Sequence, residues 1–150
     1  MENFKSVDEI LDFAIKNEEE AYEFYTDLAS RIDTPGMSKV FESFAKEEKG
    51  HKAKLLDVKK GKHLLPSKDK VLDLKIGDYL VEMEATPDMK YQDALILAMK
   101  KEKKAFKMYT DLAQRVEGAL KNTFLSLAQE EAKHKLRFEI EYDDNILSES

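Results

Sequence analysis

Hydrophobic side chains recur at every third or fourth position in four stretches of the sequence, and each stretch predicts an amphipathic helix. The helices form two pairs, which cover about residues 7–60 and about residues 91–144. The connection over about 61–90 lacks a comparable stripe, and we expect one short helical turn in it near 79–84. The pattern therefore predicts an all-α chain of 150 residues with a long crossover between its second and third helices.

Residues that favour helix ends support these boundaries. Ser6 and Glu9 form a capping box ahead of the first helix, and Pro35 suits the first position of the second. Gly61 and Gly118 are expected to end the second helix and to separate the third from the fourth. Gly50 lies inside a predicted helix, where close packing against a neighbouring helix is the plain explanation and room for a shifting histidine is an alternative.

Each apolar stripe is interrupted by polar residues at its middle. The first and third helices each contribute one glutamate, and the second and fourth each contribute a Glu-x-x-His pair. A spacing of three residues places both members of such a pair on one helix face. The interrupting residues are Glu18, Glu48, His51, Glu102, Glu131 and His134.

The sequence repeats itself, because YTDLASR at 25–31 returns as YTDLAQR at 109–115. The repeat aligns Glu18 with Glu102, and each glutamate lies as far before its turn as the Glu-x-x-His pair lies after it. We therefore expect two copies of one helical hairpin. If the hairpins pack with their apolar faces together, all six polar side chains meet in one layer of a four-helix bundle.

Four carboxylates and two imidazoles in an apolar interior require either protonation or bound cations. Four carboxylates balance two divalent ions, and oxygen and nitrogen donors suit iron or manganese, while zinc can take the same ligands. A charged pair on a helix surface is the simpler interpretation of one Glu-x-x-His pair, but the repetition favours a metal site. Glu47 and Glu130 also repeat, about 100° away around their helices, and are expected to be flanking charges.

Four sequence motifs together resemble the rubrerythrin group of ferritin-like diiron carboxylate proteins. AIKNEEEAYEFYTDLA and AMKKEKKAFKMYTDLA are similar to the first and third helices of that group, and KEEKGH and QEEAKH to the second and fourth. The resemblance implies a single ferritin-like four-helix domain over 1–150 and a site for two iron ions. It implies Glu18 and Glu102 as terminal ligands, Glu48 and Glu131 as bridging ligands, and His51 and His134 as one further ligand for each metal.

The resemblance further implies an oxidoreductase that reduces peroxide or O2, and a homodimer. Rubrerythrins usually carry a rubredoxin domain with four cysteines, whereas this sequence has no cysteine, so electrons are expected from an external donor such as a rubredoxin-type protein. Ala105 stands where rubrerythrins usually carry a further carboxylate, which gives a more symmetric six-ligand set and brings peroxidase activity into question. A ferroxidase or an iron-handling or metal-storage protein is therefore an alternative, and a bundle that has lost its metal is a third.

Tyr22, Tyr25 and Tyr109 lie near the predicted ligands and can either hydrogen-bond to a ligand, transfer electrons or simply fill the core.

Net charge and hydropathy then exclude several other functions. A net charge of −6 argues against nucleic-acid binding, and no apolar run approaches the length of a membrane span. The first residues do not resemble a secretory signal, so a cytoplasmic protein is expected.

Overall fold

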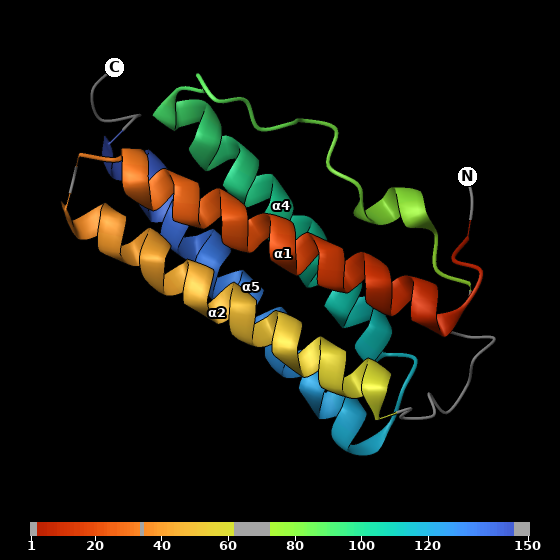
Figure 1. Ribbon diagram of the computed structural model, residues 1–150. Helices are drawn as coiled ribbons and strands as arrows, with labels where there is room; N and C mark the ends of the chain where they lie inside the picture. The colour runs from red at the N-terminus through yellow and green to blue at the C-terminus, as the bar shows by residue number, and fades with distance from the viewer. Residues whose placement is uncertain (1–2, 34, 62–72, 146–150) are drawn as a thin grey trace. The chain divides into compact units, whose positions relative to one another are not determined.

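The computed structural model describes residues 3–33, 35–61 and 73–145, in which nearly all regular structure is helical (Figure 1). The helices form two compact units, the first made of α1 and α2 and the second of α4 and α5 together with a short 3-10 helix. The elements are α1 (Val7–Arg31), α2 (Pro35–Lys60), the 3-10 helix η1 (Ile76–Tyr79), α4 (Tyr91–Ala113) and α5 (Gly118–Asn145). The expectation of an all-α chain is met in the described residues.

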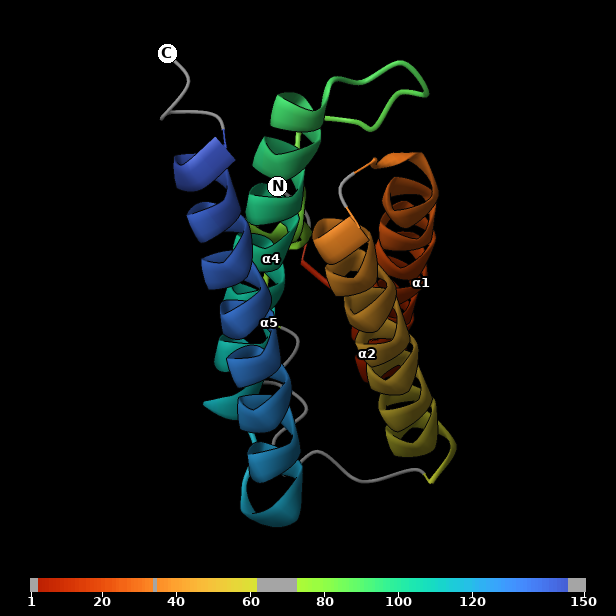
Figure 2. The same cartoon turned by 90° about the vertical axis from the view of Figure 1, so that its left-hand side faces the viewer.

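The first hairpin pairs α1 with α2 (Figure 2). Its start is capped as predicted, because the Ser6 hydroxyl accepts a hydrogen bond of 3.0 Å from the backbone N–H of Glu9. Near the turn, the Ser38 hydroxyl donates to the carbonyl of Ala29 at 2.7 Å, which fastens the two helices together. Gly61 follows the last residue of α2, where it was expected to end the helix.

In the second hairpin, α4 ends at Ala113, five residues before Gly118, which was expected to separate the two helices. The backbone tightens there, since the N–H of Arg115 bonds to the carbonyl of Leu112 and the Arg115 guanidinium donates to the carbonyl of Asp111. Gly118 has a φ of 68°, a left-handed conformation that glycine adopts without steric cost. The turn that glycine predicts is therefore present, and the helix before it is shorter than its apolar pattern suggests.

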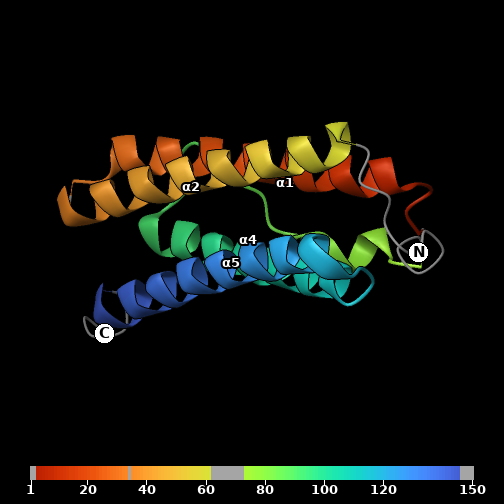
Figure 3. The same cartoon turned by 90° about the horizontal axis from the view of Figure 1, so that it is seen from below.

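The crossover packs on the second hairpin through η1, which Figure 3 shows beside α4. The predicted helical turn near 79–84 is wrong, because the turn lies at 76–79 and residues 80–84 are not helical. Tyr79 explains the shift: its ring is buried and stacks on Phe4 at 6.3 Å, and its hydroxyl donates to Asp111 at 2.8 Å. Burial and this hydrogen bond raise the pKa of Tyr79 well above its usual value.

The cores of the two hairpins consist of aromatic and aliphatic side chains, as the stripes predict. The largest fully buried side chains include Tyr25, Phe41 and Leu55 in the first hairpin and Leu95, Tyr109, Phe124 and Phe138 in the second. Among the described residues, every helix is too polar or too short to serve as a membrane span.

Candidate metal centre

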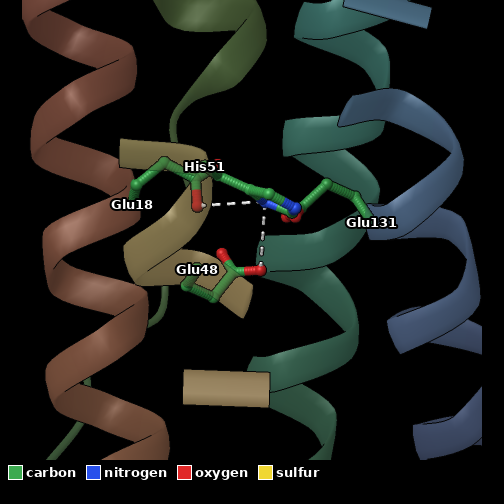
Figure 4. A group of neighbouring side chains, drawn as sticks. All are labelled: Glu18, Glu48, His51 and Glu131. Carbon is green, nitrogen blue, oxygen red and sulfur yellow. Dashed lines mark ion pairs between the residues drawn. The ribbon is translucent and has the colours of Figure 1, made fainter. Parts of the chain in front are cut away.

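In the first hairpin, three polar side chains converge within the apolar core. Glu18 comes from α1, and Glu48 and His51 come from α2; only 2%, 1% and 4% of their surfaces are exposed. The Nδ1 atom of His51 lies 3.5 Å from Oε2 of Glu18 and 3.6 Å from Oε1 of Glu48 (Figure 4). We call these three residues the first triad.

The second hairpin holds an equivalent second triad, in which Glu102 comes from α4 and Glu131 and His134 come from α5. All three are 2% exposed or less. The Nδ1 atom of His134 lies 3.6 Å from Oε2 of Glu102, so the same two atom types meet at nearly the same distance as in the first triad. The repeat in the sequence is therefore also a repeat in geometry.

Alanines on the same helix face leave room for the carboxylates. Glu18 has Ala14 four residues before it and Ala21 three residues after it, and Ala98 and Ala105 have the same places relative to Glu102. Ala14, Ala21 and Ala98 are all buried. Small side chains one turn before and one turn after each glutamate leave space on that helix face, because the side chains at i−4 and i+3 are its nearest neighbours there.

The spacing within each triad fits a bound metal ion. The ligand atoms of each triad lie within 4.8 Å of one another. Two atoms held about 2.1 Å from one ion, at angles of 90° to 120°, are about 3.0–3.6 Å apart, which includes the observed Nδ1–Oε2 distances. A charge-assisted hydrogen bond would be shorter, about 2.7–2.9 Å. Oxygen and imidazole nitrogen donors together suit iron, manganese or zinc.

Comparison with known proteins assigns the family. The rubrerythrin family profile matches residues 9–86 and 93–149, which is most of the chain. The chain belongs to the rubrerythrin family. No curated protein sequence matches it significantly.

Two solved structures share the fold of this rubrerythrin-family chain. A Thermotoga maritima protein, provisionally assigned as ferritin-like and diiron-carboxylate, has a TM-score of 0.78 at 20% identity, with 97% of this chain and 98% of that chain covered. A hypothetical protein from Pyrococcus furiosus has a TM-score of 0.69 at 28% identity, with 89% of this chain and 86% of that chain covered. The predicted ferritin-like four-helix fold class is therefore confirmed. That all six residues are ligands, that they meet in one layer, and that the hairpins form one domain stay predictions.

The glutamates that adjoin the triads in the sequence show which face of each helix points outward. Glu19, next to Glu18, is partly exposed and pairs with Lys52 at 2.8 Å, and this ion pair lowers the pKa of Glu19. Glu47 and Glu130 are not among the buried side chains. The glutamates next to the triads in this rubrerythrin-family sequence are therefore more exposed than the triad members, as the 100° step predicts, and their role as flanking charges stays a prediction.

Tyr25 and Tyr109 are fully buried and occupy matching places in the two hairpins. Tyr25 stacks on Phe41 with ring centroids 6.2 Å apart, and Tyr109 stacks on Phe124 at 6.4 Å. Tyr22 is only partly buried, with the ammonium of Lys49 5.7 Å from its ring centroid. The two buried tyrosines thus have packing roles in the core, and a role beside a metal stays a prediction.

One feature of α2 and one feature of the second hairpin differ from expectation. Gly50 is exposed, and a Cβ atom added to it would meet nothing within 4 Å, so the prediction that it allows close helix packing is wrong. Sequence reasoning also missed a pair in which the hydroxyl of partly buried Tyr91 donates to buried Glu141 at 2.6 Å. The signal was present, because Glu141 lies seven residues after His134 and therefore on nearly the same face of α5.

Proposed function

We propose that the two triads together bind two iron ions and that the protein is an oxidoreductase that reduces peroxide or O2 with electrons from an external donor. The observation that carries the proposal is the duplication of a buried Glu–Glu–His triad with the same atoms in contact in both hairpins. Membership of the rubrerythrin family supports iron as the metal.

The side chains supply charge balance and geometry. Four carboxylates compensate two divalent ions, so that a largely apolar interior can hold both without a large net charge. In this proposal Glu18 and Glu102 are terminal ligands, and Glu48 and Glu131 bridge the two ions. His51 and His134 donate through Nδ1, the atom that faces the carboxylates in each triad. A bound iron pair would supply the reversible one-electron steps of the reaction.

The electron donor is proposed to be a separate protein, of the rubredoxin type. The proposal rests on composition, because the sequence contains no cysteine with which to hold an iron–sulfur or rubredoxin centre. The low exposure of the triads favours substrates as small as peroxide and O2.

The test begins with elemental analysis of protein purified without chelator, followed by reoxidation of the reduced, iron-loaded protein in a stopped-flow instrument. We expect about two irons per chain and reoxidation by peroxide much faster than that of free ferrous ion. Glu48→Gln and Glu131→Gln should lower the iron content, whereas the adjacent Glu47→Gln and Glu130→Gln should not. No metal in the wild type, or equal loss in all four variants, would refute the proposal.

A ferroxidase or iron-handling function is the second candidate, and Ala105 favours it. Ala105 follows Glu102 by three residues, so it removes the further carboxylate of typical rubrerythrins and leaves a symmetric set of ligands. Turnover with an added reductant separates the two functions. Repeated peroxide reduction at constant iron content supports the oxidoreductase, while a single oxidation followed by accumulation of ferric iron supports the alternative.

A further inference from the structure

One face of α4 carries four lysines, Lys100, Lys103, Lys104 and Lys107. Lys104 is partly exposed and the other three are exposed. At 100° per residue, the four positions fall within about 100° of one another around the helix, and we call them the lysine face. Glu102 lies within the same run of sequence, but it is buried and lies on the roughly opposite side of the helix. One helix, about 10 Å across, therefore separates the lysine face from a predicted metal ligand.

The lysine face is electrostatically unfavourable by itself. Its members follow one another at three or four residues, as Lys100 and Lys104 or Lys103 and Lys107 do, and like charges at this spacing destabilise a helix. Lys107 pairs with Asp111 at 2.8 Å, and Lys104 donates to a backbone carbonyl of the crossover at 3.2 Å. These contacts offset only part of the repulsion, so an acidic partner bound to this face would relieve the rest.

The repeat provides an internal control for this feature. The residues of α1 that align with the lysine face are Lys16, Glu19, Glu20 and Glu23, and none of them is buried. Four lysines carry a charge of +4 on α4, whereas one lysine and three glutamates carry −2 on α1. The shared fold therefore does not require the lysines, and an acidic molecule that approaches this chain would distinguish α4 from α1.

An exposed leucine lies beside the lysine face. Leu80 is 51% exposed and comes two residues after Asp78, whose carbonyl accepts the hydrogen bond from Lys104. Two residues span at most about 7 Å, so the leucine and the lysine face form one surface. The ring of buried Tyr79 supports this surface, with Nζ of Lys107 5.5 Å from its centroid. An apolar contact bordered by lysines fits a protein complex in which charge guides the encounter.

We propose that the lysine face is the docking site of the external electron donor, and that this donor is a small acidic redox protein. The inference rests on the proposed function, because it assigns the place where electrons reach the metals. In each encounter the donor is oxidised by one electron and one ferric ion is reduced to ferrous, while no covalent bond forms or breaks. Docking on α4 places the donor one helix diameter from the second triad, so the metal there receives the electron first.

A long polyanion such as nucleic acid could also be attracted by four lysines, but the charge of the chain argues against it. The net charge is −6, so a polyanion that extends beyond the lysine face is repelled. A compact protein with a local acidic patch contacts the lysine face alone. The lysine face covers about two helical turns, which suits the small interfaces of transient redox complexes, below about 1,200 Å² in total.

Binding of a zinc-substituted rubredoxin of net negative charge to the full-length chain tests the docking site. This probe carries no transferable electron, so its binding does not depend on the chemistry of the triads. Calorimetry at low ionic strength should show weak binding that is lost as salt is added. Lys100→Glu and Lys103→Glu should each raise the Kd about tenfold, because each replaces an attraction by a repulsion. Lys16→Glu is the matched control: it changes the net charge equally at the exposed position of α1 that aligns with Lys100, and should leave the Kd unchanged.

Helix stability and electron transfer provide two further measurements. Both α4 substitutions place a glutamate four residues before a lysine, Lys104 or Lys107, which favours the helix, so loss of folding would not explain weaker binding. Reduced iron rubredoxin, mixed with the iron-loaded ferric protein in a stopped-flow instrument, should be oxidised with a second-order rate constant that falls as salt is added. The same rate constant should fall about tenfold in Lys100→Glu and stay unchanged in Lys16→Glu.

Four results would each overturn the proposal: no binding at low ionic strength, equal weakening by Lys16→Glu, tighter binding of a DNA duplex than of rubredoxin, or electron transfer that Lys100→Glu leaves unchanged. Iron content separates this inference from the proposed function. A chain that holds no iron would refute the proposed function whatever the Kd, whereas a chain that holds two irons and binds no rubredoxin would refute only the docking site.

Discussion

Replacing Glu18 with glutamine should change the stability of the protein in opposite directions without and with metal. Glu18 and Glu48 are both buried, and their nearest ligand atoms lie within 4.8 Å of each other. Without a cation, two charged carboxylates at that distance repel each other; with a cation, both are attracted to it. Glutamine keeps the shape of the side chain and removes its charge. The sign of the change in stability therefore shows whether the carboxylate of Glu18 interacts with a bound cation or only with the other carboxylate.

The magnitude follows from the distance. Two unit charges 4.8 Å apart repel by about 3 kcal/mol at an effective dielectric constant of about 20. Glu18→Gln removes this repulsion from the metal-free protein and should raise its free energy of unfolding by about 1–3 kcal/mol. For a chain of this size that corresponds to a rise in Tm of about 2–10 °C. Metal at about 1,000 times its Kd stabilises the wild type by about 4 kcal/mol per site. A variant that has lost a ligand gains less, so the order of the two Tm values should reverse.

Thermal unfolding followed by circular dichroism, with chelator and with ferrous ion in the absence of oxygen, measures both effects. Glu102→Gln should behave like Glu18→Gln, because the second triad has the same geometry. Glu19→Gln is the matched control: it changes the neighbouring, partly exposed glutamate, which pairs with Lys52. It should shift Tm slightly and equally in both conditions.

The reasoning is refuted if Glu18→Gln lowers Tm by the same amount with and without metal. That result would mean that the carboxylate stabilises the fold through its contacts in the hairpin and that its charge is not held for a cation. A rise of the same size in both conditions would equally exclude Glu18 as a ligand, since a lost ligand must cost binding energy.

Three other changes test separate features of the helices. Gly50→Ala should raise Tm by about 2–4 °C, because the added methyl group meets nothing and alanine is favoured over glycine in a helix by about 1 kcal/mol; a fall in Tm in a melting experiment would show a hidden role for the glycine. Tyr91→Phe should lower the free energy of unfolding by about 1.5–3 kcal/mol in urea titrations at neutral pH. The reason is that the buried carboxylate of Glu141 loses the hydrogen bond that the tyrosine hydroxyl donates to it. Burial and that hydrogen bond raise the pKa of Tyr91, so the folded protein keeps the hydroxyl proton at a pH near 10, where the unfolded chain releases it. The free energy of unfolding of the wild type should therefore fall as the pH rises beyond that value, and that of Tyr91→Phe should fall less.

The sequence was sufficient for the parts of the structure that periodicity controls. The buried positions of Glu18 and Glu102 follow from their place in an apolar stripe, and the repeat doubles the evidence for each. Helix ends with a capping side chain, such as Ser6, were also predictable, because the cap acts within one turn.

Features that depend on contacts between distant residues were not predictable in this way. Tyr79 places the 3-10 helix of the crossover through contacts with Phe4 and Asp111, which lie 75 and 32 residues away along the chain. Asp111 itself belongs to the repeated YTDLA motif, yet its counterpart Asp27 pairs only locally, with Arg31 at 2.9 Å. Repetition therefore predicts the position of a residue on its helix but not its partner.

The two hairpins are most alike at the two triads and differ elsewhere. Both triads keep the same residues and the same contact atoms, whereas the pair Tyr91 and Glu141 aligns with Val7 and Val58 of the first hairpin. The ends of the hairpins differ between the two copies, and they contribute no donor to the triads. If the triads were only packing elements, the buried carboxylates would be the costliest residues to retain in duplicate, and aliphatic side chains would be expected in at least one hairpin. Their retention in both hairpins supports the proposal that bound cations balance their charge.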